Sequence, residues 1–455
     1  MKYVIALLSA SLGIASCSTK ADVAAPHTWR VAANALRDPE GRAVVLRGMN
    51  LAGAHKGPPY FGFHQPADYA RLRTDWGLDS VRFLVTWSAI EPTRGNYDDA
   101  YLNELDKRMA WAEDAGVLVV LDMHQDLYGL GFSGGDGAPR WTCDEHAYAA
   151  FKPTTPWFFG YLDPNLLACV DGLYRDQDLQ SHFAEAWRRV AEKLVHHANV
   201  IGFDPLNEPH WGTYSAAGYE PDILAPLYEK LVRAVRSAAP HWVAFLEPGS
   251  SRNLGFPTKL LPFSFGDVVY SPHAYDADAE AGKGFDPAHR DRVLQVLVDY
   301  ASEARSLNAA LWIGEYGGVA ASPGIREYMR AEFDAAGAVG AGSQYWAYDR
   351  GDGYAFLNAD GSEKPDLAAQ VVRPYPQRVA GELVSYTYNE PTKALSFVMS
   401  ADPAVTAPTL VSLPPRLFPA GASVDCGGCE VTSTPGSIAL GHIPPGRRTV
   451  VVTPR

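Results

Sequence analysis

Short runs of β-branched and apolar residues recur along the chain, usually followed by a longer segment with apolar residues at spacings of three and four. This alternation is typical of βα units around a parallel sheet. The expected strands are residues 44–51, 80–86, 117–124, 200–207, 243–247, 268–273, 311–315 and 343–348. Helical spacing is clearest over residues 100–115, 179–197, 221–239 and 287–307. Eight such units predict an α/β fold, a (β/α)8 TIM barrel over residues 27–372.

The last part of the chain has a different pattern. After about Pro374, alternating stretches such as residues 383–388 and 449–452 are separated by turns rich in Pro and Gly, without helical spacing. Alternation of this kind is typical of half-buried strands. We therefore expect a C-terminal β-sandwich domain over residues 373–455.

The first residues indicate export. Met1 and Lys2 precede an uncharged run over residues 3–16, which is shorter than the roughly 20 residues of a membrane-spanning helix. The run ends Ile14-Ala15-Ser16-Cys17, which resembles the lipobox of bacterial lipoproteins, in which the cysteine is lipidated. Residues 1–17 are thus predicted to be a lipoprotein signal peptide, and the protein to be membrane-anchored, in the periplasm or at the cell surface. An ordinary cleaved signal followed by a chance cysteine is the alternative.

Four further cysteines are available for disulfides in an exported protein: Cys143, Cys169, Cys426 and Cys429. Four cysteines allow three connectivities. Pairing Cys143 with Cys169 and Cys426 with Cys429 is favoured because each pair lies within one predicted domain. The second pair could instead be a redox motif, but it lies among turn residues outside any βα unit. No matching set of Cys and His flanks either pair, so a zinc site is not expected.

Polar residues gather at the carboxyl ends of the predicted strands, where the catalytic groups of a barrel lie. They are Arg82, His124, Asp126, Asn207, Glu208, His273, Tyr275, Glu315 and Trp346. Glu208 and Glu315 follow strands four and seven, and a barrel places those strand ends across one cavity. Two opposed carboxylates can hydrolyse a glycosidic bond, one as nucleophile and one as proton donor. Arg82 would keep a nearby nucleophile ionised, and Glu247, which ends strand five, is the rival carboxylate.

Charge and chemistry limit the partners. With 39 Lys and Arg against 52 Asp and Glu, the net charge is −13, and no basic cluster is present. Nucleic acid is therefore not expected as a partner. No metal or organic cofactor is expected either, because two carboxylates supply both the nucleophile and the proton. Asp136, in the insertion after strand three, either shapes the pocket or belongs to a solvated loop.

The motifs Leu206-Asn207-Glu208-Pro209 and Gly314-Glu315-Tyr316-Gly317, with the other strand-end residues, resemble the retaining glycoside hydrolases of clan A, family 5. The resemblance covers residues 29–367 and implies that Glu208 is the general acid/base and Glu315 the nucleophile. It also implies that Asn207 binds the sugar 2-hydroxyl, that Tyr275 and Arg82 orient Glu315, and that Trp346 forms the floor of the sugar subsite. His273 is counted with the substrate-binding residues.

Within that family, the chain is similar to endoglycoceramidases and related glycosylceramide-cleaving enzymes. The similarity rests on Gly48-Met49-Asn50, Lys56, His124-Gln125-Asp126, the cysteine-bearing insertion and the C-terminal sandwich. It implies that Lys56, His124 and Asp126 bind sugar hydroxyls.

Two aromatic clusters, residues 60–63 and 157–161, either line a groove for lipid or pack loops onto the barrel. The expected function is retaining hydrolysis of glycosphingolipids, with contact to a membrane through the anchor on Cys17 and through the protein surface. The alternatives are a family-5 glucanase, mannanase or exo-glucosidase acting on soluble glycans, and a non-catalytic glycan-binding lipoprotein.

Overall fold

The computed structural model describes residues 28–215 and 217–455. The expected signal peptide and Cys17 lie outside these residues. A nine-stranded parallel sheet forms the centre of the larger domain, in the order β10-β11-β12-β4-β5-β6-β7-β8-β9, and closes through a pairing of β11 with β9. The strands are β4 (Arg47–Leu51), β5 (Ser80–Val85), β6 (Leu118–Met123), β7 (Val200–Asp204), β8 (Val243–Leu246), β9 (Val268–Tyr270), β10 (His273–Ala274), β11 (Ala310–Tyr316) and β12 (Gly342–Tyr345). β9 and β10 share one position in the ring, so the predicted (β/α)8 barrel is confirmed.

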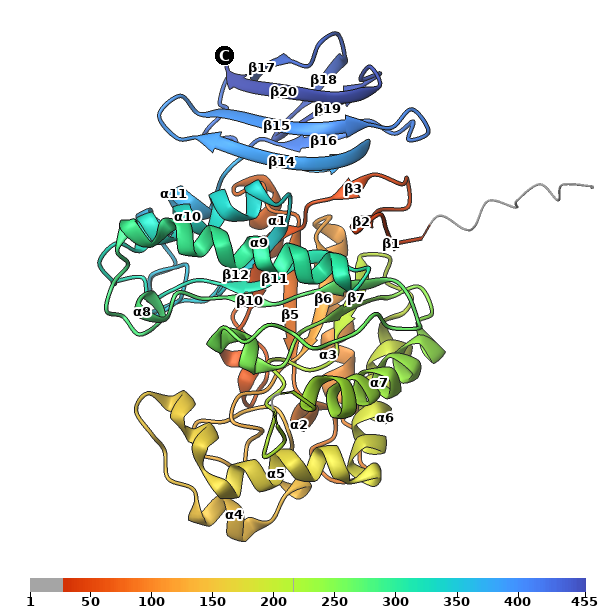
Figure 1. Ribbon diagram of the computed structural model, residues 1–455, viewed down its shortest axis with the longest axis vertical. Helices are drawn as coiled ribbons and strands as arrows, with labels where there is room; N and C mark the ends of the chain where they lie inside the picture. Colours follow the sequence, from red (N-terminus) through yellow and green to blue (C-terminus); the bar gives the residue numbers. More distant parts are fainter. Residues whose placement is uncertain (1–27, 216) are drawn as a thin grey trace, which may run out of the picture.

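Helices surround the barrel (Figure 1). They are α1 (Pro66–Thr74), α2 (Trp87–Ile90), α3 (Asp99–Asp114), α4 (Glu145–Ala150), α5 (Pro164–Arg175), α6 (Gln177–Leu194), α7 (Ala225–Ala238), α8 (Ala277–Glu280), α9 (Arg290–Ser306), α10 (Ile325–Ala338) and α11 (Pro365–Val371). Aspartates begin several of them: the Asp98 side chain accepts from two backbone N–H groups at the start of α3, and Asp176 does the same at α6. Such N-caps satisfy donors that a helix otherwise leaves unpaired.

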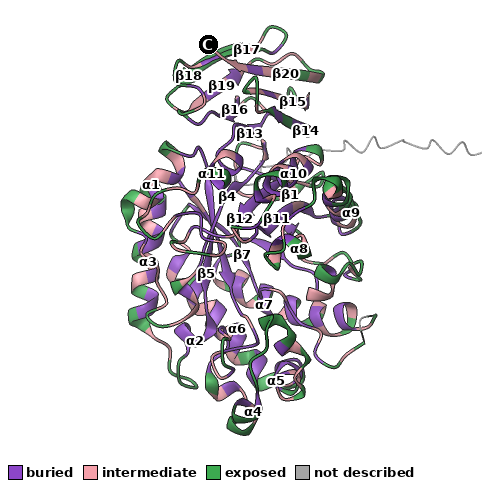
Figure 2. Ribbon diagram, turned by 90° about the vertical axis from the view of Figure 1, so that its left-hand side faces the viewer, coloured by how far each residue is buried: buried purple, intermediate pink, exposed green. Residues whose placement is uncertain are grey.

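The barrel strands are buried almost throughout, in keeping with their mainly apolar composition, and only Leu118 and Leu311 are half-buried (Figure 2). A small inner cluster that includes Val120, Ile201, Phe245 and Trp312 fills part of the barrel. Among the described residues, no helix is long and apolar enough to cross a membrane.

The C-terminal domain consists of two antiparallel sheets. Their strands are β13 (Tyr375–Val379), β14 (Gly381–Asn389), β15 (Ala394–Ala401), β16 (Thr409–Ser412), β17 (Ala422–Asp425), β18 (Glu430–Thr434), β19 (Ser437–Gly441) and β20 (Gly446–Pro454). One sheet runs β14-β15-β20-β17, and the other contains β13, β16, β19 and β18. A common core that includes Tyr386, Phe397, Val411 and Val450 joins strands of both sheets, as in a β-sandwich.

This second sheet also takes in the beginning of the described chain. β1 (Arg30–Ala32), β2 (Ala35–Arg37) and β3 (Ala43–Val44) extend it, and β3 pairs with β13 through Val44 and Arg378. The sheet therefore joins segments far apart in the sequence. The domain boundary near residue 372 stays a prediction. Both predicted disulfides, Cys143–Cys169 and Cys426–Cys429, are present.

Glu363 joins the two domains. Its carboxylate accepts hydrogen bonds from Trp76 Nε1 at 2.7 Å and Arg71 at 3.2 Å in the barrel domain, and from Arg416 of the sandwich at 2.6 and 2.8 Å. The Arg416 hydrogen bonds are the main reason that the pKa of this carboxyl falls to about 2; burial opposes them. The ionised form therefore stabilises the fold, fully above the ordinary pKa of about 4.5, and progressively less as pH falls toward 2.

We expect Glu363→Gln to lower the free energy of unfolding by about 2 kcal/mol at pH 7, because the variant loses the ionised carboxylate. Urea unfolding at several pH values measures the difference between wild type and variant. This difference in the free energy of unfolding should shrink as pH falls from 5 toward 2. Glu229→Gln, on the exposed face of α7, is the matched control and should change stability by less than about 0.5 kcal/mol. A difference that stays constant with pH would contradict the role of the ionised group.

Candidate active site

An open pocket of about 290 Å³ lies at the carboxyl ends of the barrel strands. Eight of the ten predicted site residues line it: Lys56, His124, Asp126, Asn207, Glu208, Tyr275, Glu315 and Trp346. The other two, Arg82 and His273, are buried and contact the two glutamates. The structure therefore brings all ten residues together.

The two candidate catalytic carboxylates share a contact with one imidazole nitrogen. His273 Nδ1 lies 2.8 Å from Glu208 Oε1 and 3.5 Å from Glu315 Oε2. Because both oxygens contact the same nitrogen, Glu208 Oε1 and Glu315 Oε2 must lie closer together than about 6.5 Å, the distance at which the carboxyl separations of inverting glycosidases begin. The geometry is that of a retaining pair. The side chain of Glu208 is 22% exposed and that of Glu315 only 6%, so Glu208 is the more accessible to water.

Hydrogen bonds fix the Glu315 carboxylate from two sides. Arg82 donates to Oε1 at 2.6 Å, and the Tyr275 hydroxyl donates to Oε2 at 2.8 Å. Burial raises the pKa of the Glu315 carboxyl, and the positive charges of His273 and Arg82 act against that rise. The hydrogen bonds from Arg82 and Tyr275 favour the ionised form of Glu315, which a nucleophile requires.

Arg82 is fully buried and neutralises several carboxylates at the centre of the barrel. Besides Glu315, it contacts Asp122 at 2.9 Å, Asp204 at 3.0 Å and Glu247 at 2.9 Å. It also donates to Asn207 Oδ1 at 2.9 Å. Because a buried unpaired charge is costly, this network fixes the position of the guanidinium and of the side chains around it.

Glu247, the rival carboxylate, has a different role. It is buried and contacts Arg82, His273 Nε2 at 3.1 Å, and the backbone N–H of Glu208 at 3.0 Å. Burial raises the pKa of Glu247, but His273 and Arg82 outweigh burial and lower it. The Glu208 backbone has a positive φ of 41°, which is uncommon for a residue other than glycine. Glu247 thus holds both the imidazole and the strained backbone that carries Glu208.

Strand β7 ends at Asp204, three residues earlier than predicted, and Asn207 and Glu208 follow in a short segment. Backbone and side-chain bonds hold this segment against β6. Asn207 N donates to Met123 O at 3.0 Å, and the Asn207 side chain donates to Gln125 O at 3.1 Å. The side-chain oxygen of Asn207 is engaged by Arg82, so a sugar hydroxyl would meet the amide NH₂ group.

A charged cluster forms one wall of the pocket. The Lys56 ammonium contacts Asp126 and lies 3.7 Å from Asp136, and His124 Nδ1 lies 2.7 Å from Asp122 Oδ2. Burial lowers the pKa of His124 and Lys56 adds to this, but Asp122 and Asp126 bring it to about 9. Lys56 itself supplies the positive charge between Asp126 and Asp136, whose oxygens and a His124 nitrogen have the spacing of metal ligands.

Trp346 lies over this wall. Its ring stacks on His124 at a centroid distance of 5.3 Å, and Lys56 Nζ lies 4.9 Å from the ring centroid. The ring lines the pocket, so a sugar could pack against it.

The sequence reasoning missed or left open the pocket residues Asp136, Trp157, Glu280 and Tyr354, and it missed Asn253, which contacts Glu208. Asn253, in the short helix η5 (Ser250–Leu254) after β8, donates to Glu208 Oε1 at 2.8 Å. Burial raises the pKa of Asp136 to about 7, and that of Glu280 to about 7 with added repulsion from Glu208. These residues lie in loops or in the short helices within them, where no strand periodicity indicates the direction of a side chain.

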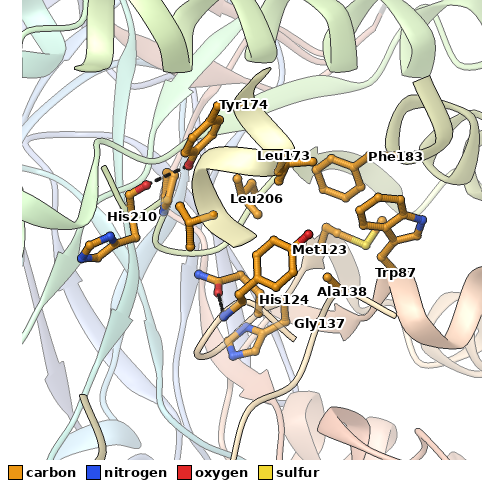
Figure 3. Close-up of a pocket in the computed structure, with 14 residues that line it drawn as sticks. Trp87, Met123, His124, Gly137, Ala138, Leu173, Tyr174, Phe183, Leu206 and His210 are labelled. Carbon is orange, nitrogen blue, oxygen red and sulfur yellow. Dashed lines mark hydrogen bonds between the residues drawn. The ribbon is translucent and has the colours of Figure 1, made fainter. Parts of the chain in front are cut away.

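A second cavity lies behind His124 and is lined mainly by apolar side chains, among them Trp87, Met123, Leu173, Phe183 and Leu206 (Figure 3). Its volume of about 30 Å³ suffices for roughly two water molecules, each of which needs about 10–15 Å³. It therefore has no room for a sugar ring or an acyl chain.

The two aromatic clusters differ. In the first, Phe61 stacks on Tyr101, and Arg350 lies over the Phe63 ring. This cluster packs a loop onto the barrel. In the second, η3 (Trp157–Leu162), Tyr161 is fixed inward while Trp157, Phe158 and Phe159 are exposed.

Comparison with known proteins gives consistent matches. The sequence model of the family "Cellulase (glycosyl hydrolase family 5)" matches residues 37–352, and that of the "Glycoside hydrolase family 5 C-terminal domain" matches residues 373–452. Endoglycoceramidase I of Rhodococcus hoagii is 27% identical over 442 residues, which cover 92% of this chain and 86% of the relative. A glucosylceramidase of Aspergillus fumigatus is 30% identical over 251 residues, 40% of this chain and 32% of the relative.

The structure is similar to that of endo-glycoceramidase II from Rhodococcus sp. in its ganglioside GM3 complex. The TM-score is 0.85 at 29% identity, over 92% of this chain and 99% of the other. A lactosyl-enzyme intermediate of the same Rhodococcus protein matches with a TM-score of 0.83 at 29% identity, over 93% of this chain and 100% of the other.

Proposed function

The chain belongs to glycoside hydrolase family 5 and is a retaining glycoside hydrolase, and from this premise we propose that it hydrolyses the bond between sugar and lipid in glycosphingolipids. The observation that carries the mechanism is the shared contact of Glu208 and Glu315 with His273 Nδ1. It brings the two carboxylates close together, and both line one pocket of about 290 Å³.

In the first step, a Glu315 oxygen attacks the anomeric carbon while the bond to the glycosidic oxygen breaks. Glu208 gives its proton to that oxygen, so the lipid leaves as an alcohol. In the second step, Glu208 takes a proton from water as the water oxygen attacks the anomeric carbon, and Glu315 is released. His273 and Asn253 both donate to Glu208 Oε1, so Oε2 is the oxygen that carries the proton.

The remaining residues bind and orient. Arg82 and Tyr275 hold the Glu315 carboxylate ready to attack. The Asn207 amide faces the sugar 2-hydroxyl, Trp346 provides an apolar floor, and Lys56, His124 and Asp126 bind hydroxyls along the charged wall. His273 acts as a cation: burial lowers its pKa, but Glu247, Glu315 and Glu208 together raise it well above the ordinary value.

Two observations favour a lipid aglycone. The relative that matches 92% of this chain is an endoglycoceramidase, and so is the protein whose ganglioside complex the structure resembles. In this chain, the exposed indole of Trp157 lines the pocket that contains Glu208, so an apolar surface begins beside the proton donor.

Substrate choice is tested with lactosylceramide and glucosylceramide in detergent micelles, compared with cellodextrins and an aryl β-glucoside. We expect release of ceramide, detected by thin-layer chromatography. Release of intact lactose from lactosylceramide would indicate cleavage of the bond next to the lipid. Rapid cleavage of cellodextrins without release of ceramide would contradict the proposed substrate and favour a soluble glycan.

Asn253 should help position the proton donor. We expect Asn253→Ala to lower kcat/KM about 3- to 10-fold for glycosides with poor leaving groups, because the Glu208 carboxyl loses one of two hydrogen bonds to Oε1. For a dinitrophenyl glycoside, which departs without protonation, the loss should be less than about 2-fold. A loss of equal size for both substrates would indicate a general structural effect.

We also infer that the protein is exported and held on a membrane by a lipid on Cys17, because the residues before that cysteine resemble a lipobox. Labelling with radioactive palmitate in a bacterial host should mark the wild-type chain and not Cys17→Ser. Labelling of both chains would contradict the anchor.

A further inference from the structure

Exposed apolar side chains of the described residues concentrate in two segments of the chain. Of eleven large hydrophobic residues classed as exposed, seven lie in two segments that follow β6 and β8. We call these seven the apolar rim: Trp157, Phe158, Phe159, Leu162, Leu254, Phe256 and Leu261, which are 39 to 72% exposed. The two segments, residues 156–162 and 254–261, contain a single charged side chain, that of Lys259. Exposed apolar side chains that gather beside a functional site mark an interaction surface.

Both segments of the apolar rim adjoin residues that surround Glu208. Trp157 lines the pocket itself. Tyr161 fixes the first segment, because its hydroxyl accepts from Leu127 N at 2.8 Å and its ring stacks on His210 at 4.7 Å. The second segment begins one residue after Asn253, which donates to Glu208. The apolar rim thus adjoins the active site on the side of Glu208, the proton donor.

We propose that the apolar rim is a docking surface for an electrically neutral lipid bilayer, which presents the sugar headgroup of the glycolipid to the pocket. The inference rests on the proposed function. The lipid leaves from the side of Glu208, where the apolar rim lies, so the rim would contact the membrane that contains the aglycone. Aromatic and aliphatic side chains of this kind insert into the boundary between headgroups and acyl chains.

Charge decides which bilayer suits the surface. The chain has a net charge of −13, so an anionic membrane would repel it. Contact must come from apolar burial rather than from basic residues, which favours a zwitterionic or uncharged lipid surface.

The test uses Phe158→Ser/Phe159→Ser/Leu254→Ser/Phe256→Ser, which leaves Trp157 and Asn253 unchanged. All chains carry Cys17→Ser, so that a lipid on this residue cannot hold them on a membrane. The matched control is Leu294→Ser/Val298→Ser, which removes two exposed apolar side chains of α9. Turnover of a soluble aryl glycoside by each chain reports folding and an intact site.

With lactosylceramide in phosphatidylcholine vesicles, we expect the rim variant to lose at least 10-fold in turnover. In detergent micelles and on the aryl glycoside, it should stay within about 2-fold of the parent, and the control should match the parent throughout. The parent should also float with plain phosphatidylcholine vesicles, and the rim variant should not.

Undiminished vesicle turnover or flotation of the rim variant would overturn the docking surface. Flotation needs no turnover, so it tests the surface separately. If the parent floats but releases no ceramide even from micelles, the proposed substrate fails and the docking surface stands.

Discussion

Glu315→Gln is expected to lower kcat roughly 10⁴-fold or more, for every glycoside the enzyme accepts. The amide has nearly the shape of the carboxylate but cannot attack the anomeric carbon, so the first chemical step is lost. Arg82 can still donate to the amide oxygen, and the Tyr275 hydroxyl can accept from the amide NH₂, so the fold should persist. Turnover of an aryl glycoside and of lactosylceramide measures the loss, with circular dichroism as the check on folding.

The matched control is Glu280→Gln. Glu280 lines the same pocket and is partly buried, yet it contributes no charge to the proposed steps, so turnover should change less than about 10-fold. A Glu315 variant that retains more than a tenth of wild-type turnover would refute its assignment as nucleophile.

Glu208→Ala is expected to have an effect that depends on the leaving group. For lactosylceramide, whose alkoxide is a poor leaving group, kcat/KM should fall about 10²- to 10⁴-fold, because the glycosidic oxygen departs without its proton. For a dinitrophenyl glycoside, the first step should survive, and hydrolysis of the covalent intermediate should become limiting because no base activates water.

Added azide needs no base, so it should restore turnover of the dinitrophenyl substrate by Glu208→Ala and produce a β-glycosyl azide. The anomeric configuration of that product can be read by proton NMR. An α-glycosyl azide, or no rescue, would contradict the proposed division of roles between the two glutamates.

The barrel was predictable because its strands are short, buried and rich in β-branched residues, and each one precedes a helix. One predicted strand, residues 268–273, is divided into β9 and β10. Pro272 lies in the gap and has no N–H to donate to a neighbouring strand. The pairing of β3 with β13 was not predictable, since β3 is two residues long and its partner lies more than 300 residues away.

The candidate site was predictable where side chains follow strands. Arg82, Glu208, Tyr275 and Glu315 follow from strand order, because a barrel brings all its carboxyl ends to one face. Asn253 and Glu280 lie in or beside short helices of long loops, whose conformations depend on tertiary packing. The function of Glu247 was also hidden: its position at a strand end suggested a rival catalyst, whereas its contacts show support for His273 and Glu208.

The central claim is that Glu315 attacks the sugar while Glu208 faces it across the pocket. A 2-deoxy-2-fluoro glycoside with a dinitrophenyl leaving group slows hydrolysis of the intermediate and traps the sugar on the nucleophile. Peptide mapping by mass spectrometry after trapping should find the label on Glu315 alone. A label on Glu208 or Glu247, or inactivation without a covalent sugar, would contradict the account.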